Sequence, residues 1–410
     1  MEVQNYDIAI LGAGPAGASA ALCLSGQGYS VVLLDKHRFP RDKTCGDAMS
    51  PDVINQLSKI RPSLLERFNT NEHRQRMIGV KAFAPNGSVL EINTLKSSNR
   101  DGCVISREEF DNVLIEEVKT CQDILLLEET EIKEVNRIPD GYSLKGPSTD
   151  IACKMLIACD GINSFVARKF ANHKLDRKHH CGALRIYYEG VEFESREKIE
   201  LHFIEDVLPG YLWIFPMANN KANVGIGMLS EYVSKKKVNL KEVLERVIKE
   251  HPTISPRFAH AKPLETVKGM GIPLGSKKVQ LSSDHLLIAG DAASLVDPLT
   301  GEGIGNAIRS GRFAAQYAAQ AIKDQKYSAE YLKAYDKKIY SMVGPELKFS
   351  HFLQKLMRGP RIANFLISTT SKSKRYKRLI SYLFEENHFF GDWAKWSFYK
   401  KALFNRRVKG

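Results

Sequence analysis

Short apolar runs, bounded by glycines and polar turns, recur along the chain. They occupy residues 6–11 (YDIAIL), 30–35 (SVVLLD), 155–158 (MLIA) and 285–289 (HLLIA). Runs of this length with turn signals at both ends are typical of buried strands. Small residues between the first two runs predict a closely packed helix. The pattern therefore predicts a βαβ unit at the start of the chain and further buried strands later in it.

A second pattern, with apolar and polar positions in alternation, fills residues 72–103 and 124–156. Each stretch contains a turn signal, PNG at 85–87 and PDG at 139–141. Alternation around such a turn predicts a β-hairpin with one buried face. We expect the first hairpin to belong to a sheet separate from the βαβ unit.

Residues 181–230 also show strand patterns, and one strand in this region carries three aromatic residues in register. Alternation places Tyr211, Trp213 and Phe215 on the same face. Aromatic residues in such a row either pack in the core of a sheet or line a cavity for a flat or long apolar ligand. The pattern alone leaves both interpretations open.

Helical periodicity is clear from residue 104 to about residue 121. Ser106 lies near the start of this stretch and Glu109 lies three positions after Ser106, which is the spacing of a capping box. After about residue 321 the chain consists of amphipathic, Lys-, Arg-, Tyr- and Phe-rich segments. We expect these helices to break at Gly344-Pro345 and at Gly359-Pro360, since proline disrupts a helix interior.

The first candidate site follows the first predicted strand. Gly12, Gly14 and Gly17 form a GxGxxG motif there, and Asp35 ends the next strand. In dinucleotide-binding βαβ units, such glycines let the backbone turn tightly beside a pyrophosphate, and the acid binds ribose hydroxyls. The arrangement predicts a dinucleotide site, with NAD and FAD both open at this point.

A second candidate site begins after the strand at 285–289. Asp291 follows this strand, and a loop with Pro298, Gly301 and Gly303 then leads into a helix of small residues. Free amides in the first turn of a helix attract anions, so this stretch suits the other half of a cofactor site. A plain connecting loop is the alternative.

A long polar loop after Asp35 contains the sequence Cys-Gly-Asp at 45–47. Long loops beside a cofactor are usually functional, whereas a mobile surface loop is the simpler explanation. Cys45 by itself is equally well explained as a small packed residue.

Composition narrows the class of protein. The seven cysteines show no CxxC or CxxH spacing, which argues against a zinc site, an iron–sulfur cluster or a disulfide framework and favours a reducing compartment. No signal-peptide pattern and no apolar run of about 18 residues is present. We therefore expect a cytoplasmic protein without a transmembrane helix.

The net charge of +13 lies at one end of the chain. Residues 323–410 carry 20 Lys and Arg against 7 Asp and Glu, while the preceding residues are balanced. In this region, segments 372–378 (KSKRYKR) and 389–407 mix cations with aromatic residues. Such a surface is either simply solvated or makes peripheral contact with an anionic membrane, at its inner face. No other motif supports nucleic-acid binding, and we expect none.

Taken together, the motifs resemble those of flavoproteins of the p-hydroxybenzoate hydroxylase type and, among them, the geranylgeranyl reductase family. The resemblance covers about residues 5–322. The motifs that carry it are GxGPAG at 12–17, the acid at 35, CGD at 45–47, RxxFD at 107–111, DGxxSxVAR at 160–168, YxWxFP at 211–216, NVGxG at 223–227 and GDAAxxxDPxxGEGIxxA at 290–307.

The resemblance implies FAD as the cofactor and assigns roles to particular residues. Arg107 would lie near the pyrophosphate and flavin chain, Asp160 would also help to hold a nicotinamide donor, and Ile304 would offer an amide to the flavin. Asp35 stands where many relatives have Glu. The residues implied to bind FAD are Gly12, Gly14, Pro15, Ala16, Gly17, Asp35, Lys36, Cys45, Gly46, Arg107, Asp160, Gly161, Asp291, Pro298, Gly301, Gly303 and Ile304.

The implied activity is reduction of carbon–carbon double bonds in an isoprenoid chain by hydride transfer from reduced flavin. Cys45 is the candidate proton donor, and Tyr211 and Trp213 are the candidate residues of the substrate wall. The electron donor stays open between NAD(P)H and a ferredoxin. An aromatic monooxygenase or halogenase-like enzyme using NAD(P)H and oxygen is the alternative, although a halogenase would carry WxWxIP where this chain has Tyr211 and Phe215.

The implied architecture is α/β (α+β), with three regions. A discontinuous Rossmann-type FAD-binding domain would comprise residues 1–75, 104–170 and 283–322. An inserted antiparallel-sheet domain for the substrate would comprise 76–103 and 171–282. A basic helical extension would comprise 323–410.

Overall fold

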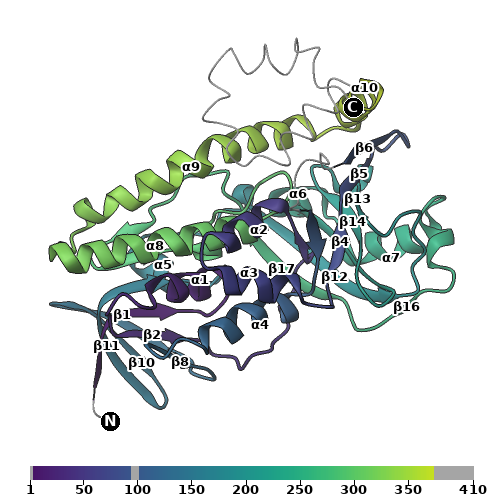
Figure 1. The fold of residues 1–410 in the computed structure, drawn as a ribbon. Coiled ribbons are helices and arrows are strands. Elements are labelled where there is room, and N and C mark those ends of the chain that lie inside the picture. Colours follow the sequence, from purple (N-terminus) through teal and green to yellow (C-terminus); the bar gives the residue numbers. More distant parts are fainter. Residues whose placement is uncertain (1–2, 94–100, 374–410) are drawn as a thin grey trace, which may run out of the picture.

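The computed structural model describes residues 3–93 and 101–373. Two large sheets meet along one edge, and helices cover the first (Figure 1). The basic segment 389–407 and nearly all of 372–378 lie outside the described residues.

The first sheet is a mostly parallel, Rossmann-like layer. Strands β19, β11, β1, β2 and β8 are parallel neighbours, and β9 and β10 extend β11 as an antiparallel meander. All four residues of β2 are buried, as both faces of such a sheet are covered. The strands are β1 (Gln4–Leu11), β2 (Val31–Leu34), β8 (Ile124–Leu127), β9 (Glu134–Ile138), β10 (Gly141–Gly146), β11 (Thr149–Ala158), β18 (Ser282–Ser283) and β19 (Leu286–Ile288).

Small residues hold the helices close to the first sheet. A Cβ at Gly311 would lie 2.0 Å from the Ala16 carbonyl oxygen, so two helices touch there through their backbones. Ser106 caps the helix α4, as predicted, by accepting a hydrogen bond from the Glu109 amide. The helices of this layer are α1 (Pro15–Leu24), α2 (Pro51–Ser58), α3 (Pro62–Asn69), α4 (Arg107–Val118), α5 (Phe165–Phe170) and α8 (Ile304–Asp324).

The second sheet is mainly antiparallel, and its central strand confirms the alternation of residues 211–216. Leu212 and Ile214 pack against the helix α7, while Trp213 and Phe215 join a separate cluster on the other face. The strands are β5 (Gly79–Phe83), β6 (Val89–Asn93), β12 (His180–Glu189), β13 (Lys198–His202), β14 (Tyr211–Pro216), β15 (Lys221–Leu229), β16 (Lys262–Pro263) and β17 (Lys268–Pro273), and the helices are α6 (Ser230–Lys236) and α7 (Leu240–Glu250).

Shorter elements connect the two sheets. A small third sheet lies beside the Cys45 loop, and both predicted hairpins, β5–β6 and β9–β10, are confirmed. The third sheet comprises β3 (Ala48–Met49), β4 (Gln75–Met77) and β7 (Gly102–Val104), and the 3-10 turns are Arg177–His179, Glu205–Val207, Ser255–Phe258 and Gly290–Ala293.

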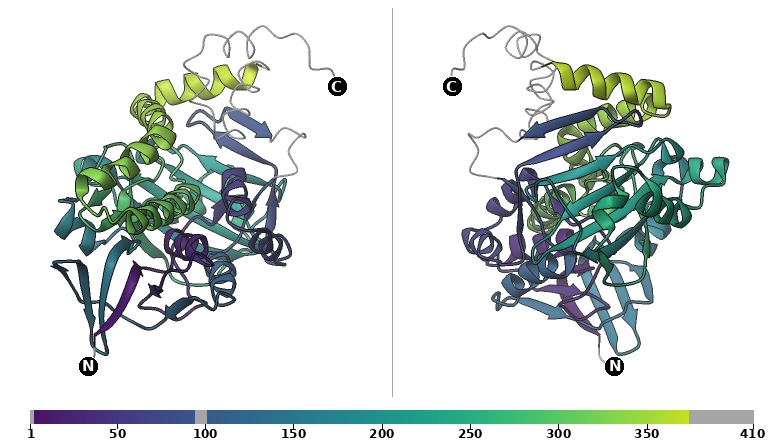
Figure 2. Two further views of the ribbon diagram at one scale, coloured as in Figure 1. Left: turned by 60° about the vertical axis from the view of Figure 1, so that its left-hand side comes forward. Right: turned by 90° about the vertical axis from the view of Figure 1, so that its right-hand side faces the viewer.

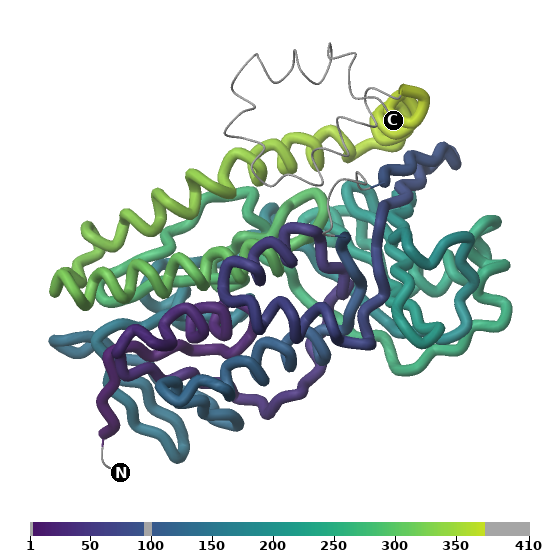
Figure 3. The backbone as a smooth tube through the Cα atoms, in the orientation of Figure 1, coloured from purple at the N-terminus to yellow at the C-terminus, as the bar shows by residue number. Residues whose placement is uncertain are grey.

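Two helices follow the sheets, α9 (Ala329–Leu356) and α10 (Pro360–Lys372). Helix α9 lies beside α8 and ends near the β5–β6 hairpin, where α10 begins (Figures 2 and 3). The predicted break at Gly359-Pro360 is confirmed, but the break at Gly344-Pro345 is wrong. Helix α9 continues through Pro345 because Val343 and Leu347, on either side, are buried in the core of the first sheet, which offsets the lost backbone hydrogen bond.

The predicted fold class is thus confirmed: a parallel Rossmann-like sheet, a separate antiparallel sheet and C-terminal helices. The three domain ranges stay a prediction. Residues 329–347 of α9 contribute to the same core as the first sheet, so this part of the C-terminal region packs against the preceding chain.

Candidate cofactor and substrate site

A cavity of about 590 Å³ lies where the two sheets meet. The residues that follow four parallel strands line it, at Gly12, Asp35, Asp160 and Asp291. The carboxyl ends of parallel strands are the usual ligand-binding edge of such a sheet. The topology therefore brings together two motifs that are almost 280 residues apart in the sequence.

The glycine-rich turn after β1 is shaped by close backbone contacts. Gly12 has a φ of +100°, and a Cβ there would lie 2.3 Å from the carbonyl oxygen of Cys159. At Gly14 a Cβ would meet, among described residues, only Arg41 at 3.9 Å, so its backbone borders open cavity. This is the free approach that a pyrophosphate beside a helix N-terminus needs.

Gly17 is not among the residues that line the cavity, and its contact with the cofactor stays a prediction. A Cβ at Gly17 would lie 1.8 Å from the Gly12 carbonyl oxygen. The third glycine of the motif is therefore required for packing α1 against the turn.

Asp35 fixes the same turn while facing the cavity. One of its carboxylate oxygens accepts a hydrogen bond from the Ala13 amide at 2.8 Å, and the other accepts from the His37 amide at 2.9 Å. The second of these oxygens also lies 3.2 Å from a nitrogen of the His37 ring, whereas the first keeps a lone pair for a ribose hydroxyl. Lys36 lines the cavity next to it.

Arg107 is a buried cation on the cavity wall. It forms two hydrogen bonds with Asp111, both 2.7 Å long, and Arg41 pairs with the same carboxylate at 2.8 Å. Although burial raises the pKa of Asp111, the two arginines lower it below its ordinary value. Two arginines share one carboxylate, so this group carries a net positive charge at the edge of the cavity, where it would face a pyrophosphate.

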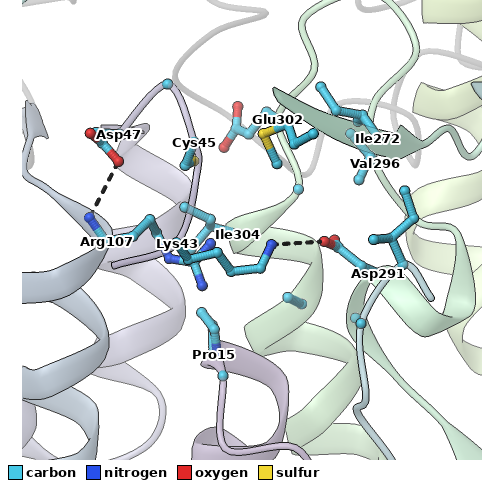
Figure 4. A pocket seen from close by; sticks show the side chains of 18 of the residues that line it. Pro15, Lys43, Cys45, Asp47, Arg107, Ile272, Asp291, Val296, Glu302 and Ile304 are labelled. Atoms are coloured by element: carbon cyan, nitrogen blue, oxygen red, sulfur yellow. Dashed lines mark hydrogen bonds and ion pairs between the residues drawn. The ribbon is translucent and has the colours of Figure 1, made fainter. Parts of the chain in front are cut away.

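The stretch after β19 forms the opposite side of the cavity. Helix α8 begins at Ile304 without a side-chain cap, so amides of its first turn remain available to a ligand. Gly301 and Gly303 line the approach to this helix. Figure 4 shows Lys43 reaching across the cavity toward Asp291, with 3.8 Å between amine and carboxylate.

Pro298 also lies outside the residues that line the cavity, and its contact with the cofactor stays a prediction. Its carbonyl oxygen accepts a hydrogen bond from the Gln354 side chain on α9. Pro298 therefore anchors the loop to the C-terminal helices. All the other predicted cofactor residues line the cavity, as do Cys45, Tyr211 and Trp213.

The aromatic row of β14 forms one wall. The ring centroids of Tyr211 and Trp213, and those of Trp213 and Phe215, are 6.3 Å apart. Gly225 leaves space for the indole, since a Cβ there would lie 2.2 Å from the Trp213 ring. Both interpretations of this row apply: Trp213 and Phe215 pack in a buried cluster, and all three aromatic residues line the cavity, with Gly46 against the Trp213 and Phe215 rings.

Several cavity residues were not predicted as site residues: Lys43, Asp47, Glu302 and the second-sheet residue Leu201. Asp47 and Glu302 belong to the CGD and GEG sequences, which provided a signal. Leu201 gave none, because an apolar residue in an alternating strand is compatible with any core.

Glu302 is a partly buried carboxyl group on the cavity whose pKa is raised. Burial first, and then the nearby carboxylates of Asp52 and Asp297, raise its pKa to about 7, against the effect of the Ser50 hydroxyl that donates to it. A carboxyl group of this kind changes charge near neutrality.

Groups of side chains that could bind a metal ion are absent from the described part of the chain. No three His, Cys, Asp or Glu side chains there are grouped to hold a metal ion. All seven cysteines, each within the described ranges, are unpaired. Nor does any helix among these residues have the length and apolar character needed to cross a membrane.

Comparison with known proteins identifies the class of the molecule. Residues 5–343 match the family model described as FAD binding domain, so the chain is an FAD-binding flavoprotein. A crystal structure of a geranylgeranyl bacteriochlorophyll reductase-like protein from Thermoplasma acidophilum superposes with a TM-score of 0.80 at 22% identity, covering 96% of this chain and 99% of that one. The flavin-dependent brominase Bmp2 superposes with a TM-score of 0.77 at 17% identity, covering 97% and 100%.

The sequence relatives narrow this class. Digeranylgeranylglycerophospholipid reductase 2 of Methanosphaera stadtmanae is 33% identical over 80% of this chain and 81% of its own length. The digeranylgeranylglycerophospholipid reductase of Methanosarcina acetivorans is 28% identical over 98% of this chain and 96% of its own. The chain belongs to the geranylgeranyl reductase family of FAD-binding flavoproteins, and the resemblance predicted from its motifs is confirmed.

The geometry fits FAD. The open backbone at Gly14 and the uncapped start of α8 give one cavity two groups of amides for anionic or electron-rich ligand atoms. The buried Arg107 adds positive charge between them.

Proposed function

We propose that the protein reduces carbon–carbon double bonds of an isoprenoid chain. One observation carries the proposal: the cofactor cavity is continuous with an apolar chamber. Beyond the aromatic wall, the same cavity is lined by Met77, Val80, Ile92, Ile199 and Leu201, from β4, β5, β6 and β13. An elongated apolar ligand in this chamber would lie beside the aromatic row.

Each part of the cavity has a role in this reaction. When bound, FAD supplies the hydride for reduction of an isolated double bond. The amides at the start of α8 stabilise negative charge beside them. The apolar chamber orients the isoprenoid chain and excludes water, and the Cys45 thiol, which lines the same cavity as Trp213 and Phe215, supplies the proton. The electron donor is a nicotinamide nucleotide or a ferredoxin.

An anaerobic half-reaction tests this function. The purified, FAD-loaded protein is reduced chemically and mixed with a geranylgeranyl lipid. Rapid return of the oxidised flavin spectrum, with a saturated bond in the lipid, supports the proposal. In a parallel aerobic mixture with an aromatic substrate, flavin reoxidation that yields a hydroxylated product would instead favour a monooxygenase, provided that the lipid leaves the anaerobic flavin reduced.

We expect Asp291→Ala to weaken FAD binding strongly. Asp291 lies on the cavity at the end of β19 and offers its carboxylate to hydroxyl groups of a ligand. The flavin absorbance of the purified variant, compared with that of Asp284→Ala on the outer surface, measures the effect. A yellow, fully loaded Asp291→Ala protein would contradict the role.

We further propose peripheral contact with an anionic membrane through the end of α9 and α10. Phe352, Ile362 and Phe365 are 55%, 44% and 67% exposed there. Lys355, Arg358 and Arg361 lie on the same segments. Apolar side chains among cations suit the interface of an anionic bilayer, from which an isoprenoid lipid would enter the chamber.

Replacing Phe352, Ile362 and Phe365 by serine is expected to lower cosedimentation with anionic vesicles several-fold, because each exposed apolar group contributes to interfacial binding. Neutral vesicles and the matched replacement of exposed Leu175 and Leu264 are the controls. Equal sedimentation of the triple variant and the wild type would refute this surface.

A further inference from the structure

A chain of hydrogen bonds joins the aromatic wall to the Cys45 loop. The Trp213 indole donates to the Asn223 side-chain oxygen at 2.8 Å. The Asn223 amide group donates in turn to the carbonyl oxygen of Cys45 at 2.8 Å and to the carboxylate of Asp47 at 2.7 Å. The loop and the wall are thus held as one unit, and Asp47 is at its centre.

Asp47 is a carboxyl group with no solvent exposure, although its residue lines the cavity. It also accepts a hydrogen bond from the Tyr187 hydroxyl at 2.6 Å and one from the Arg107 amide at 3.2 Å (Figure 4). Its φ of +66° is a left-handed conformation that aspartate and asparagine tolerate better than most residues. The backbone and three donors therefore place this carboxyl group firmly.

Tyr187 is held in place by charged residues on its other side. The ring is only partly buried, and the Arg185 guanidinium lies 3.8 Å from its centroid. Arg185 pairs with Asp42 at 3.0 Å, and Asp42 pairs with the partly exposed Lys268 at 2.6 Å. These contacts fix the ring, so the Tyr187 hydroxyl holds the Asp47 carboxyl group in position.

The charged and titratable groups that face Asp47 are Tyr187 and Arg185 of β12, Arg107 of α4 and Cys45 of its own loop. Burial raises the pKa of Asp47 to about 6, although Tyr187 and Arg185 lower it. Burial, and then the negative charge of Asp47, raise the pKa of Cys45, so the thiol keeps its proton at neutral pH. Asp47 follows Cys45 by two positions, and the Asn223 amide group binds both residues, so the loop geometry keeps them together.

We propose that Asp47 is the residue that reloads Cys45 with a proton in each turnover, with Tyr187 as the donor that holds its carboxyl group in place. The inference rests on the proposed function. Because Asp47 acts through Cys45, it is a positioning residue and proton relay. It is not the group that touches the substrate.

The proton balance is as follows. A hydride reaches one alkene carbon, and the π electrons form a new bond from the other carbon to the proton of the Cys45 thiol, whose S–H electrons stay on sulfur. The thiolate then takes the proton of the Asp47 carboxylic acid. The resulting carboxylate takes a proton from solvent that enters the cavity when the product leaves, whereas Tyr187 keeps its hydroxyl proton, because burial and the charge of Asp47 raise its pKa well above the ordinary value. A nicotinamide or ferredoxin donor provides the two electrons of the hydride, with its proton from solvent.

The central variant is Asp47→Asn, which keeps the size and the left-handed conformation and, with its oxygen toward Tyr187 and Asn223, two of the three hydrogen bonds, but cannot transfer a proton. We expect it to bind FAD normally by absorbance and to reduce the isoprenoid at the wild-type rate in the first turnover, in which Cys45 already carries a proton, but about 100-fold more slowly in later turnovers. Its solvent deuterium isotope effect should rise, since reprotonation becomes limiting. Tyr187→Phe should show a smaller decrease of the same kind, and Asp140→Asn, in the exposed β9–β10 turn, should show none.

An infrared titration provides a readout without turnover. A carboxylic acid band that disappears as the pH rises through about 6 in the FAD-loaded wild type should be absent from Asp47→Asn, while that of Glu302 remains. An Asp47→Asn enzyme with the wild-type rate in later turnovers and the wild-type isotope effect would overturn the relay alone. Loss of FAD with an unchanged isotope effect would show a purely structural role. A wild type that reduces no isoprenoid would overturn the proposed function, and the relay with it.

Discussion

A Gly12→Ala variant is expected to accumulate as unstable protein without flavin. The added Cβ would lie 2.3 Å from the Cys159 carbonyl oxygen, and alanine would have to adopt a φ of +100°. Strained backbone alone costs about 1–3 kcal/mol, and the clash separates β1 from β11 at the edge that holds the cofactor. Thermal unfolding and flavin absorbance measure the two effects.

Gly14→Ala is the matched control for this prediction. The same methyl group there would project into the cavity, with Arg41 at 3.9 Å as its nearest described neighbour. We expect wild-type stability of the apoprotein but weaker FAD binding. Equal stability losses in the two variants would show that the turn was misinterpreted.

Arg107→Gln is expected to destabilise the protein by about 3 kcal/mol at neutral pH, because it leaves the Asp111 carboxylate buried with Arg41 as its remaining charged partner. Asp111 has no solvent exposure, so the lost attraction is not replaced by hydration. Urea unfolding of the wild type and the variant measures the difference, and the Arg107→Gln/Asp111→Asn double variant should recover part of it.

The pH dependence of this difference has a definite sign. In the wild type the arginines lower the pKa of Asp111, so the pair stabilises the fold above the ordinary carboxyl pKa and loses this effect as the pH falls through the lower folded value. In the variant, burial prevails and Asp111 takes up a proton more easily. The destabilisation should therefore shrink on acidification; a difference that grows instead would contradict the account of the pair.

Local sequence was sufficient to predict much of the fold. The strand ends at Gly12 and Asp35, the Ser106 cap and both hairpin turns depend on residues close in sequence, so their patterns were informative. The continuous α9 was not predictable in this way. Pro345 is a local signal for a break, whereas the burial of Val343 and Leu347 that overrides it depends on the tertiary structure.

The candidate site also combines features that follow from local sequence with features that depend on tertiary structure. Motifs located both halves of the cavity, but Gly17 and Pro298 belong to those motifs for packing reasons that only the contacts reveal. The link from Asn223 through Asp47 to Tyr187 joins residues up to 176 positions apart. Side-chain hydrogen bonds between distant residues do not recur at a fixed spacing as the buried positions of a helix or strand do, so they could not be predicted from the sequence pattern.

Mass spectrometry of cellular lipids tests most directly whether this flavoprotein saturates isoprenoid chains. Lipids from cells with and without the expressed protein are compared, with Gly12→Ala as the inactive control. We predict a gain of two mass units per reduced double bond in one isoprenoid lipid class, seen with the wild type alone. Unchanged lipids together with hydroxylated or halogenated aromatic compounds would contradict the account.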